Sequence, residues 1–362
     1  MKIISHTILK VNKTTIINFE FLDYFVLSNK FGLSYNYREK ECEVKRMSIR
    51  SDNARILRQL SLYLNLMPDA IDGKMVDEIA FGCDKEQREY AYATLLATYC
   101  GFDIVDSKED KAFFREKFTR MCHIQKKAEF ENDPYYKNIK FPEVTNETWQ
   151  FKTLVFKPYE AFLANESVLD SGGRLFPQIG FFEESFSYPA VLQDGREWMT
   201  VTPHEIRTTM PAVKKSFGNV LTYGLGLGYF PYMAHMKNNV KSVTIVEKDE
   251  RVIELFTKYI LPQFPEKEKV KVICADAFEF AEKETSEKFY DFIFADTWHD
   301  PSDGVEMYEK FKECEKYSPE SEYMYWIEKT LKYYISLDKN SDEDTSPIFK
   351  EGTPFSIKFI EN

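Results

Sequence analysis

The sequence lacks any unbroken apolar run of about 18 residues or more, the length that a membrane-spanning helix needs. Its first ten residues contain no apolar core of signal-peptide length. The six cysteines are scattered along 362 residues, and none belongs to a C-x-x-C pair. Isolated cysteines in a chain of this length are typical of free thiols in a reducing compartment. We therefore expect a cytoplasmic protein with no membrane-spanning segment.

Positive charge is also scarce, because 48 Lys and Arg residues face 59 Asp and Glu residues, for a net charge of −11. Binding a nucleic-acid backbone requires clustered Lys and Arg, and the sequence shows no such stripe. We therefore expect neither nucleic acid nor membrane as a partner. We also expect no metal site, since His299 with Asp300 and Asp303 matches no established ligand spacing.

The most informative stretch begins with a predicted strand, a glycine-rich turn and a helix. Residues 220–223 read as a short buried strand, and residues 230–237 read as the helix that follows it. Between them stand Gly224, Gly226 and Gly228. Glycine suits a turn with unusual backbone angles, and it lets a ligand approach the backbone closely. This order of elements predicts a site for a nucleotide-like ligand at a helix N-terminus.

Three later apolar strands each end in a carboxylate, at Glu247, Asp276 and Asp296. A carboxylate about 20 residues past the glycines can accept hydrogen bonds from ribose hydroxyls, which Glu247 satisfies. A helix predicted from Asp249 to about Ile260 separates the first two of these strands. Because parallel strands end at one edge of a sheet, we expect the three carboxylates to line the edge where such folds bind ligands.

Three ligand assignments are compatible with this pattern. A nicotinamide dinucleotide favours G-x-G-x-x-G, but here Tyr229 fills the slot of the third glycine. A Rossmann-like unit without a ligand would leave the coincidence of glycines and strand-end acids unexplained. We therefore favour S-adenosylmethionine (SAM).

Residues 219–300 resemble a class I SAM-dependent methyltransferase domain, and in particular the spermidine synthase branch, which also lacks an acid before its first glycine. The resemblance extends back to about Tyr188. The stretch around Asp194-Gly195 is similar to the β-hairpin that precedes the core in spermidine synthases, and His204-Glu205 to the pair that opens their next helix. We read Glu205 itself as the closing residue of a capping box.

This resemblance implies an α/β fold with a Rossmann-like class I methyltransferase sheet, shortened at its C-terminal strands. A β-hairpin before the core and a helical N-terminal domain complete the expected architecture. The predicted organisation is a mainly helical domain over 1–150, a connecting helix and hairpin over 151–215, the SAM-binding domain over 216–337, and an acidic loop and tail over 338–362.

The resemblance also assigns cofactor contacts. The three glycines would approach the methionine part of SAM, and Glu247 would bind the ribose hydroxyls. Asp276 would accept from the adenine amino group, with Ala277 packed near the ring. Asp296 is the expected catalytic residue, because the acid at this strand end helps to deprotonate the attacking amine in spermidine synthases.

Three further residues are candidates for substrate contacts. His204 begins the helix beside the expected cofactor, while Trp298 and His299 belong to the polar loop after Asp296. One departure from the family matters, because spermidine synthases carry an Asp inside the glycine loop where this chain has Leu227. That Asp would hold the ammonium of an aminopropyl group.

These observations predict a SAM-dependent methyltransferase that acts on a small acceptor, with amines as one class. The alternatives are an aminopropyltransferase that uses decarboxylated SAM and a polyamine, and a non-catalytic binding protein that keeps the fold. Because spermidine synthases are commonly dimers, the resemblance also suggests a homo-oligomer.

Overall fold

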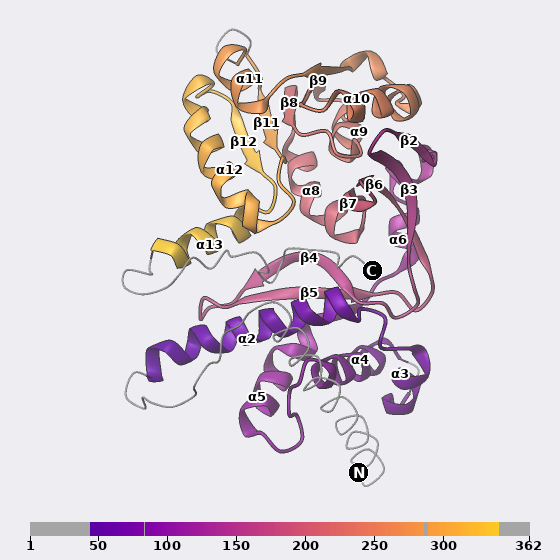
Figure 1. Cartoon of the computed structure of the whole chain (residues 1–362), viewed down its shortest axis with the longest axis vertical. Helices are drawn as coiled ribbons and strands as arrows, with labels where there is room; N and C mark the ends of the chain where they lie inside the picture. The colour runs from indigo at the N-terminus through magenta and orange to yellow at the C-terminus, as the bar shows by residue number, and fades with distance from the viewer. Residues whose placement is uncertain (1–43, 83, 286–288, 340–362) are drawn as a thin grey trace. The chain divides into compact units, whose positions relative to one another are not determined.

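The computed structural model describes residues 44–82, 84–285 and 289–339 (Figure 1). Two compact units are present, and each consists of several chain segments. The first comprises residues up to Ile124, with Pro158–Phe162 and Val168–Glu183. The second comprises Gln125–Lys157, Leu163–Ser167 and the chain from Glu184 onward. The predicted acidic loop and tail lie outside the described residues from position 340 on.

Helices dominate the first unit, as the sequence predicts. They are α2 (Val44–Leu66), α3 (Gly73–Ile79), α4 (Lys85–Tyr99) and α5 (Lys108–Glu116). Asp84 and Ser107 cap the N-termini of α4 and α5, because their side chains accept from the backbone N–H groups of Gln87 and Asp110. Strand β5 (Leu175–Phe181) pairs in parallel with β1 (Cys122–Ile124) and neighbours β4 (Phe162–Leu169). The connecting helix predicted within 151–215, before the hairpin, is wrong, because the segment ahead of β5 forms β4 instead.

The hairpin before the core is present as β6 (Phe186–Gln193) and β7 (Arg196–Thr200). Its turn residues Asp194 and Gly195 both have positive φ, at 53° and 79°. Such angles are typical of the tight turns that Asp-Gly favours. Strands β2 (Val144–Asn146) and β3 (Trp149–Phe156) extend the hairpin to a four-stranded sheet of order β2-β3-β6-β7.

The core of the second unit is a five-stranded parallel sheet of order β10-β9-β8-β11-β12. Its strands are β8 (Gly218–Tyr223), β9 (Val240–Glu247), β10 (Val270–Cys274), β11 (Phe292–Ala295) and β12 (Glu322–Tyr325). The central strands are buried on both faces, which is why they read as continuous apolar runs. The predicted Rossmann-like sheet is confirmed, and its strand order changes direction at β8.

Helices cover both faces of this sheet. They are α8 (Pro203–Lys215), α9 (Tyr229–His235), α10 (Glu250–Leu255), α11 (Ala277–Lys283), α12 (Pro301–Cys314) and α13 (Glu328–Lys339). Figure 1 shows α8 and α9 to one side of the strands and α11 and α12 to the other. Two short helices, α6 (Lys127–Glu131) and α7 (Pro134–Asn138), precede β2. Among the described residues, no helix is long and apolar enough to cross a membrane.

One element differs from the sequence-based expectation. The spacing of Tyr323, Trp326 and Leu331 predicts a long helix after Ser318, yet β12 comes first and α13 follows it. Strand β12 pairs with β11 in parallel. The hydroxyl of Ser321 donates to the carbonyl oxygen of Tyr290 at 2.6 Å and anchors the start of this strand. Pairing with the free edge of β11 therefore overrides the local helical spacing, and the helix forms only from the start of α13.

Candidate functional site

The glycine turn between β8 and α9 has the backbone that only glycine adopts easily. Gly224, Gly226 and Gly228 have φ values of 93°, 50° and 79°. A Cβ atom on Gly224 would collide with the backbone carbonyl oxygen of Asp296, and one on Gly228 with the ring of Phe256. These two glycines are therefore required by packing inside the unit, and Gly224 brings the turn against the end of β11.

Gly226 differs from the other two glycines, because the space above it is filled by a flexible side chain. A Cβ atom there would meet the sulfur of Met199, from the hairpin strand β7. The backbone N–H of Leu227 donates to the same sulfur at 3.1 Å. Both Met199 and Gly226 are partly exposed, whereas Leu225 and Leu227 are buried.

Glu247, at the end of β9, is tied to the glycine turn. Its Oε2 accepts from the backbone N–H of Leu225 at 3.2 Å. Its Oε1 accepts from the N–H groups of Lys248 and Asp249, at 2.8 and 3.0 Å. A carboxylate has about four lone-pair positions, so one remains beyond these three bonds. The partly exposed Glu247 is therefore held in one orientation with room for a further donor.

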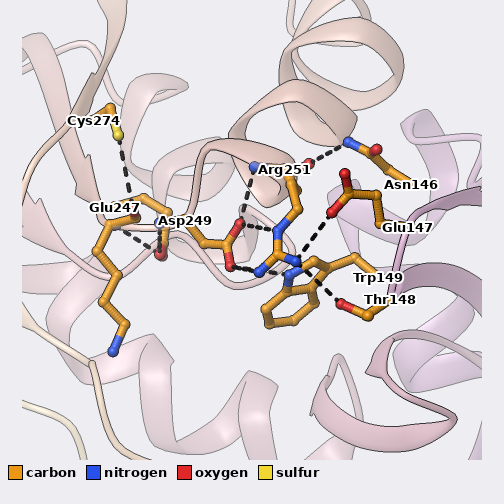
Figure 2. A network of polar contacts seen from close by, with 9 residues as sticks. Asn146, Glu147, Thr148, Trp149, Glu247, Asp249, Arg251 and Cys274 are labelled. Carbon is orange, nitrogen blue, oxygen red and sulfur yellow. Dashed lines mark hydrogen bonds and ion pairs between the residues drawn. The ribbon is translucent and has the colours of Figure 1, made fainter.

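A polar network next to Glu247 was not predicted from the sequence. Figure 2 shows the guanidinium of Arg251 between Asp249 and Glu147, with the indole of Trp149 on the same aspartate. The Arg251 Nη2 donates to Asp249 at 2.7 Å and Trp149 Nε1 donates to it at 3.0 Å. These hydrogen bonds, with that of Arg251 the largest cause, lower the pKa of the Asp249 carboxyl. The network fastens the turn between β2 and β3 to the start of α10.

Asp276 and its neighbours form the start of α11. The Oδ1 of Asp276 accepts from the N–H groups of Phe278 and Glu279, at 2.9 and 3.1 Å, so this exposed side chain caps the helix. Ala277 and Phe278 are partly buried beside it. The roles of Asp276 and Ala277 toward an adenine ring stay predictions.

The structure brings a second carboxyl group to Asp296. Asp296 follows β11, and burial raises the pKa of its carboxyl well above the usual range, with a further contribution from the charge of Glu205. Glu205 is 7% exposed, and burial raises its pKa to about 7. The hydroxyl of Thr209 donates to Glu205 Oε1 at 2.9 Å. The charges of the buried Glu205 and the partly exposed Asp296 thus interact at the sheet edge.

The capping box predicted for the start of α8 is wrong. Thr202 precedes the helix as expected, but its side chain caps no backbone N–H group. The Glu205 carboxyl instead accepts from the Thr209 hydroxyl, and its charge contributes to the raised pKa of Asp296. An acid at the third helical position, followed four residues later by threonine, was compatible with both arrangements. The sequence therefore gave no signal that Glu205 belongs to the site.

His204 lies on the same turn of α8 as Glu205. Burial lowers the pKa of its imidazole to about 4, so the ring is neutral near pH 7. It contacts the indole of Trp326 edge-to-face, with the ring centres 5.9 Å apart. His204 therefore contributes a neutral ring to this part of the molecule rather than a charge.

The loop after Asp296 places its two aromatic candidates differently. Trp298 is only 5% exposed, and its indole packs so closely on Gly304 that a Cβ atom there would lie 2.7 Å away. Trp298 thus belongs to the packed interior beside α12. His299 is exposed, with its Nδ1 2.9 Å from Asp303 Oδ2. Its ring stands edge-to-face against Trp198 of β7, with the centres 4.0 Å apart.

Helix α7 supports the glycine turn through a hydrogen bond to its backbone. The hydroxyl of Tyr135 donates to the carbonyl oxygen of Leu227 at 2.6 Å. The hydroxyl of the adjacent Tyr136 donates to the carbonyl oxygen of Val201, just before α8. The helix therefore holds the turn and the start of α8 at a set spacing. The sequence reads only as a loop here, because helices of five residues carry little periodic signal.

Tyr229, which takes the slot of the third dinucleotide glycine, points into the interior. Its hydroxyl donates to Asp133 Oδ2 at 2.9 Å, and Asp133 is only 8% exposed. Burial raises the pKa of this aspartate. A buried phenol and its acceptor occupy this place, which agrees with the rejection of a dinucleotide fingerprint.

Comparison with known proteins identifies the segment that carries these features. Residues 224–317 match the family model of the spermine/spermidine synthase domain. This segment contains the glycine turn, the three strand-end acids and the loop after Asp296. No curated protein sequence matches the chain.

Solved structures similar to the chain include several methyltransferases. A candidate SAM-dependent methyltransferase from Streptococcus mutans is 19% identical over 35% of this chain and 36% of its own, with a TM-score of 0.27. A candidate caffeoyl-CoA O-methyltransferase from Staphylococcus aureus is 20% identical over 36% and 71%, with a TM-score of 0.27. Human methyltransferase-like protein 13 in complex with SAH is 20% identical over 36% and 65%, with a TM-score of 0.25. The similarity thus spans about a third of the first of these proteins.

The sheet topology and the family match agree on the same segment of the chain. Both agree with the predicted resemblance of residues 224–317 to the spermidine synthase-like branch of class I SAM-dependent methyltransferases.

Proposed function

We propose that the protein is a SAM-dependent transferase that methylates a small acceptor, with Asp296 as the base and a cationic amine as the favoured acceptor. The observation that carries this proposal is the position of Asp296 directly after β11, at the carboxyl edge of the parallel sheet, where its charge interacts with that of Glu205 from α8. Such an edge, at the point where the strand order changes direction, is where open α/β sheets bind ligands.

The residues at the other end of this edge fit a SAM molecule. Glu247 is oriented by three backbone N–H groups and keeps one lone-pair position for a ribose hydroxyl. Gly226 is partly exposed and has a positive φ, so a methionine part can approach its backbone once the Met199 side chain moves aside. When bound, SAM supplies a carbon made electrophilic by a sulfonium.

Asp296 is suited to take a proton from an acceptor at this edge. An amine arrives as an ammonium and must lose a proton before it can act as a nucleophile. Because burial and the charge of Glu205 raise the pKa of Asp296, its carboxylate is a stronger base than an exposed aspartate. Its backbone lies against Gly224, so the base is placed next to the glycine turn.

Glu205 supports a cationic acceptor. Burial, rather than a neighbouring cation, dominates the pKa of both carboxyl groups. Two buried carboxylates repel each other, and an ammonium between them would offset both charges and their desolvation. The site therefore favours a positively charged acceptor over a neutral or acidic one.

An aminopropyltransferase is the second candidate, and the family match favours it. Leu227 weighs against this candidate, because it stands where that family carries the Asp for the ammonium of the aminopropyl group. Leucine at this position carries no carboxylate, and its side chain is fully buried. Methyl transfer needs no such group and remains the first choice.

Calorimetric titration with SAM, decarboxylated SAM and NAD, run side by side, tests the cofactor. We expect SAM to bind most tightly. A preference for decarboxylated SAM would replace methyl transfer by aminopropyl transfer, and binding of NAD alone would overturn the assignment. The acceptor is then sought among di- and polyamines by mass spectrometry of the products. Glu309→Gln, at an exposed carboxylate of α12, is the matched control for Asp296→Asn in this assay.

A further inference from the structure

A side chain from the hairpin, not from the Rossmann-like core, lies over the middle glycine of the glycine turn. Met199 is the fourth residue of β7, which is an edge strand of its sheet. Its sulfur accepts from the N–H of Leu227 at 3.1 Å. Its sulfur, methyl and Cγ atoms are the three nearest atoms to a Cβ built on Gly226. One methionine side chain therefore covers the middle glycine of the turn.

This contact is not part of the packed core. The core side of the turn is filled by Leu225 and Leu227, which are 3% and 0% exposed. Met199 and Gly226 are both partly exposed, so their contact lies at the surface rather than in the buried core. A side chain in such a position gains less from burial than a core methionine and can leave without opening a cavity.

Met199 occupies a backbone donor that the proposed cofactor could use. The methionine part of SAM has a flexible chain of similar length, but it carries a charged sulfonium, an ammonium and a carboxylate in place of a neutral thioether. The backbone N–H of Leu227, used here by the thioether, is a donor that a cofactor could use in its place. A thioether is a weak hydrogen-bond acceptor, so a charged or carbonyl oxygen would replace it readily.

We propose that Met199 fills the place of the cofactor's methionine part when no cofactor is bound, and swings out when SAM binds. This inference rests on the proposed function, because it takes SAM as the ligand of the glycine turn. Met199 then sets the affinity for SAM, since each binding event must first displace it. The three rotatable bonds of methionine make this movement possible while β7 stays in place.

The affinity test compares Met199→Ala with the wild-type protein by calorimetric titration with SAM. Removing the occupant should tighten SAM binding roughly fivefold, because the free protein no longer has to expose the turn. Met236→Ala is the matched control, because this 46% exposed methionine lies at the far end of α9 and should leave the affinity unchanged. Weaker or unchanged binding by Met199→Ala would show that Met199 is a wall of the site or a bystander.

A second measurement on the wild-type protein follows the side chain itself. Hydrogen peroxide oxidises exposed methionines, and peptide mass spectrometry reports the rate at each position. With saturating SAM, Met199 should oxidise several times faster than without it, with Met236 as the internal reference. Slower oxidation would mean that SAM covers Met199, which contradicts the proposal.

The two tests also separate this inference from the proposed function. If the wild-type protein binds SAM and Met199→Ala binds no better, only the role of Met199 fails. If neither protein binds SAM, the cofactor assignment fails and the inference fails with it. Binding by Met199→Ala alone would be the strongest support for both.

Discussion

The carboxyl groups at the ends of β9 and β11, on the same edge of the parallel sheet, have pKa values shifted in opposite directions. At the end of β9, Glu247 and Asp249 accept hydrogen bonds from backbone N–H groups, Trp149 and Arg251, and the pKa of Asp249 is lowered. At the end of β11, burial raises the pKa of Asp296, with a further rise from the charge of Glu205. The first end is therefore an ordered set of charged acceptors, which suits binding. At the second end, the raised pKa values of Asp296 and Glu205 favour protonation closer to neutral pH, which suits proton transfer.

The largest expected effect comes from removing the base at the β11 end. Asp296→Asn should lower turnover by about 10²- to 10⁴-fold, the usual contribution of a general base. The affinity for SAM should change by less than about twofold, because the cofactor contacts lie at the other end. Turnover is measured with the acceptor identified by product analysis, and SAM binding by calorimetry. A variant that keeps full activity would show that Asp296 is not the base.

Glu205→Gln probes the cost of burying the second carboxyl. The pKa of Glu205 is about 7 in the folded protein, above its value of 4.5 when unperturbed, so the folded state binds the proton more tightly. Ionisation therefore destabilises the wild-type protein as pH rises from about 4.5 to 7, and the full cost is present above pH 7.

Glutamine carries no such charge, so Glu205→Gln should gain stability over wild type at pH 8, by up to about 3 kcal/mol, and much less at pH 5. Urea unfolding at the two pH values measures this difference. His204 titrates in both proteins and cancels from the comparison. An equal effect at pH 5 and 8 would mean that Glu205 ionises in the folded protein as freely as in water.

Tyr135→Phe tests the support beneath the site. It removes one buried hydrogen bond, from the Tyr135 hydroxyl to the carbonyl oxygen of Leu227. We expect a loss of about 1 kcal/mol in the free energy of unfolding, with weaker SAM binding because the glycine turn loosens. Tyr136→Phe is the matched control, because it frees Val201 instead and should affect SAM binding less. Equal effects of the two variants on SAM affinity would argue against a specific role of α7 in holding the turn.

The smallest effect is expected at the network of the β9 end. Asp249 is partly exposed, so Asp249→Asn should cost only about 0.5–1 kcal/mol of stability, and less at high salt. The folded pKa of Asp249 is lowered, so its contribution is present above its unperturbed pKa and is lost as pH falls through the folded value. Thermal unfolding at neutral and acidic pH checks this. A loss that is independent of salt would show that packing, not charge, makes the contact.

The sequence predicted the backbone framework of the candidate site because its signals were local. The positive φ values of Gly224, Gly226 and Gly228 follow from a turn that excludes other residues. Glu247 and Asp296 were found because each ends an apolar strand, and the carboxyl ends of parallel strands meet at one edge. The turn at Asp194-Gly195 was predicted for the same kind of reason, since its backbone angles suit few residues.

Predictions failed where contacts between segments far apart in the chain determine the structure. Strand β12 was read as helix, because its pairing with β11 is invisible in the local spacing of its aromatic residues. Glu205 was read as a cap, although its carboxyl bonds to Thr209 and its charge acts on Asp296, which is far along the chain. Trp298 was a candidate for a substrate contact, but its ring packs in the interior against Gly304.

The sequence by itself therefore determined the glycine turn, the strands from β8 to β11, and the acids that end these strands. Each of these depends on backbone angles or on hydrophobic periodicity within a few residues. Only the tertiary structure decided which carboxyl groups lie together, how their pKa values move, and that Met199 covers Gly226. Burial and electrostatic coupling depend on distances between segments that are remote in the chain, and no local pattern records them.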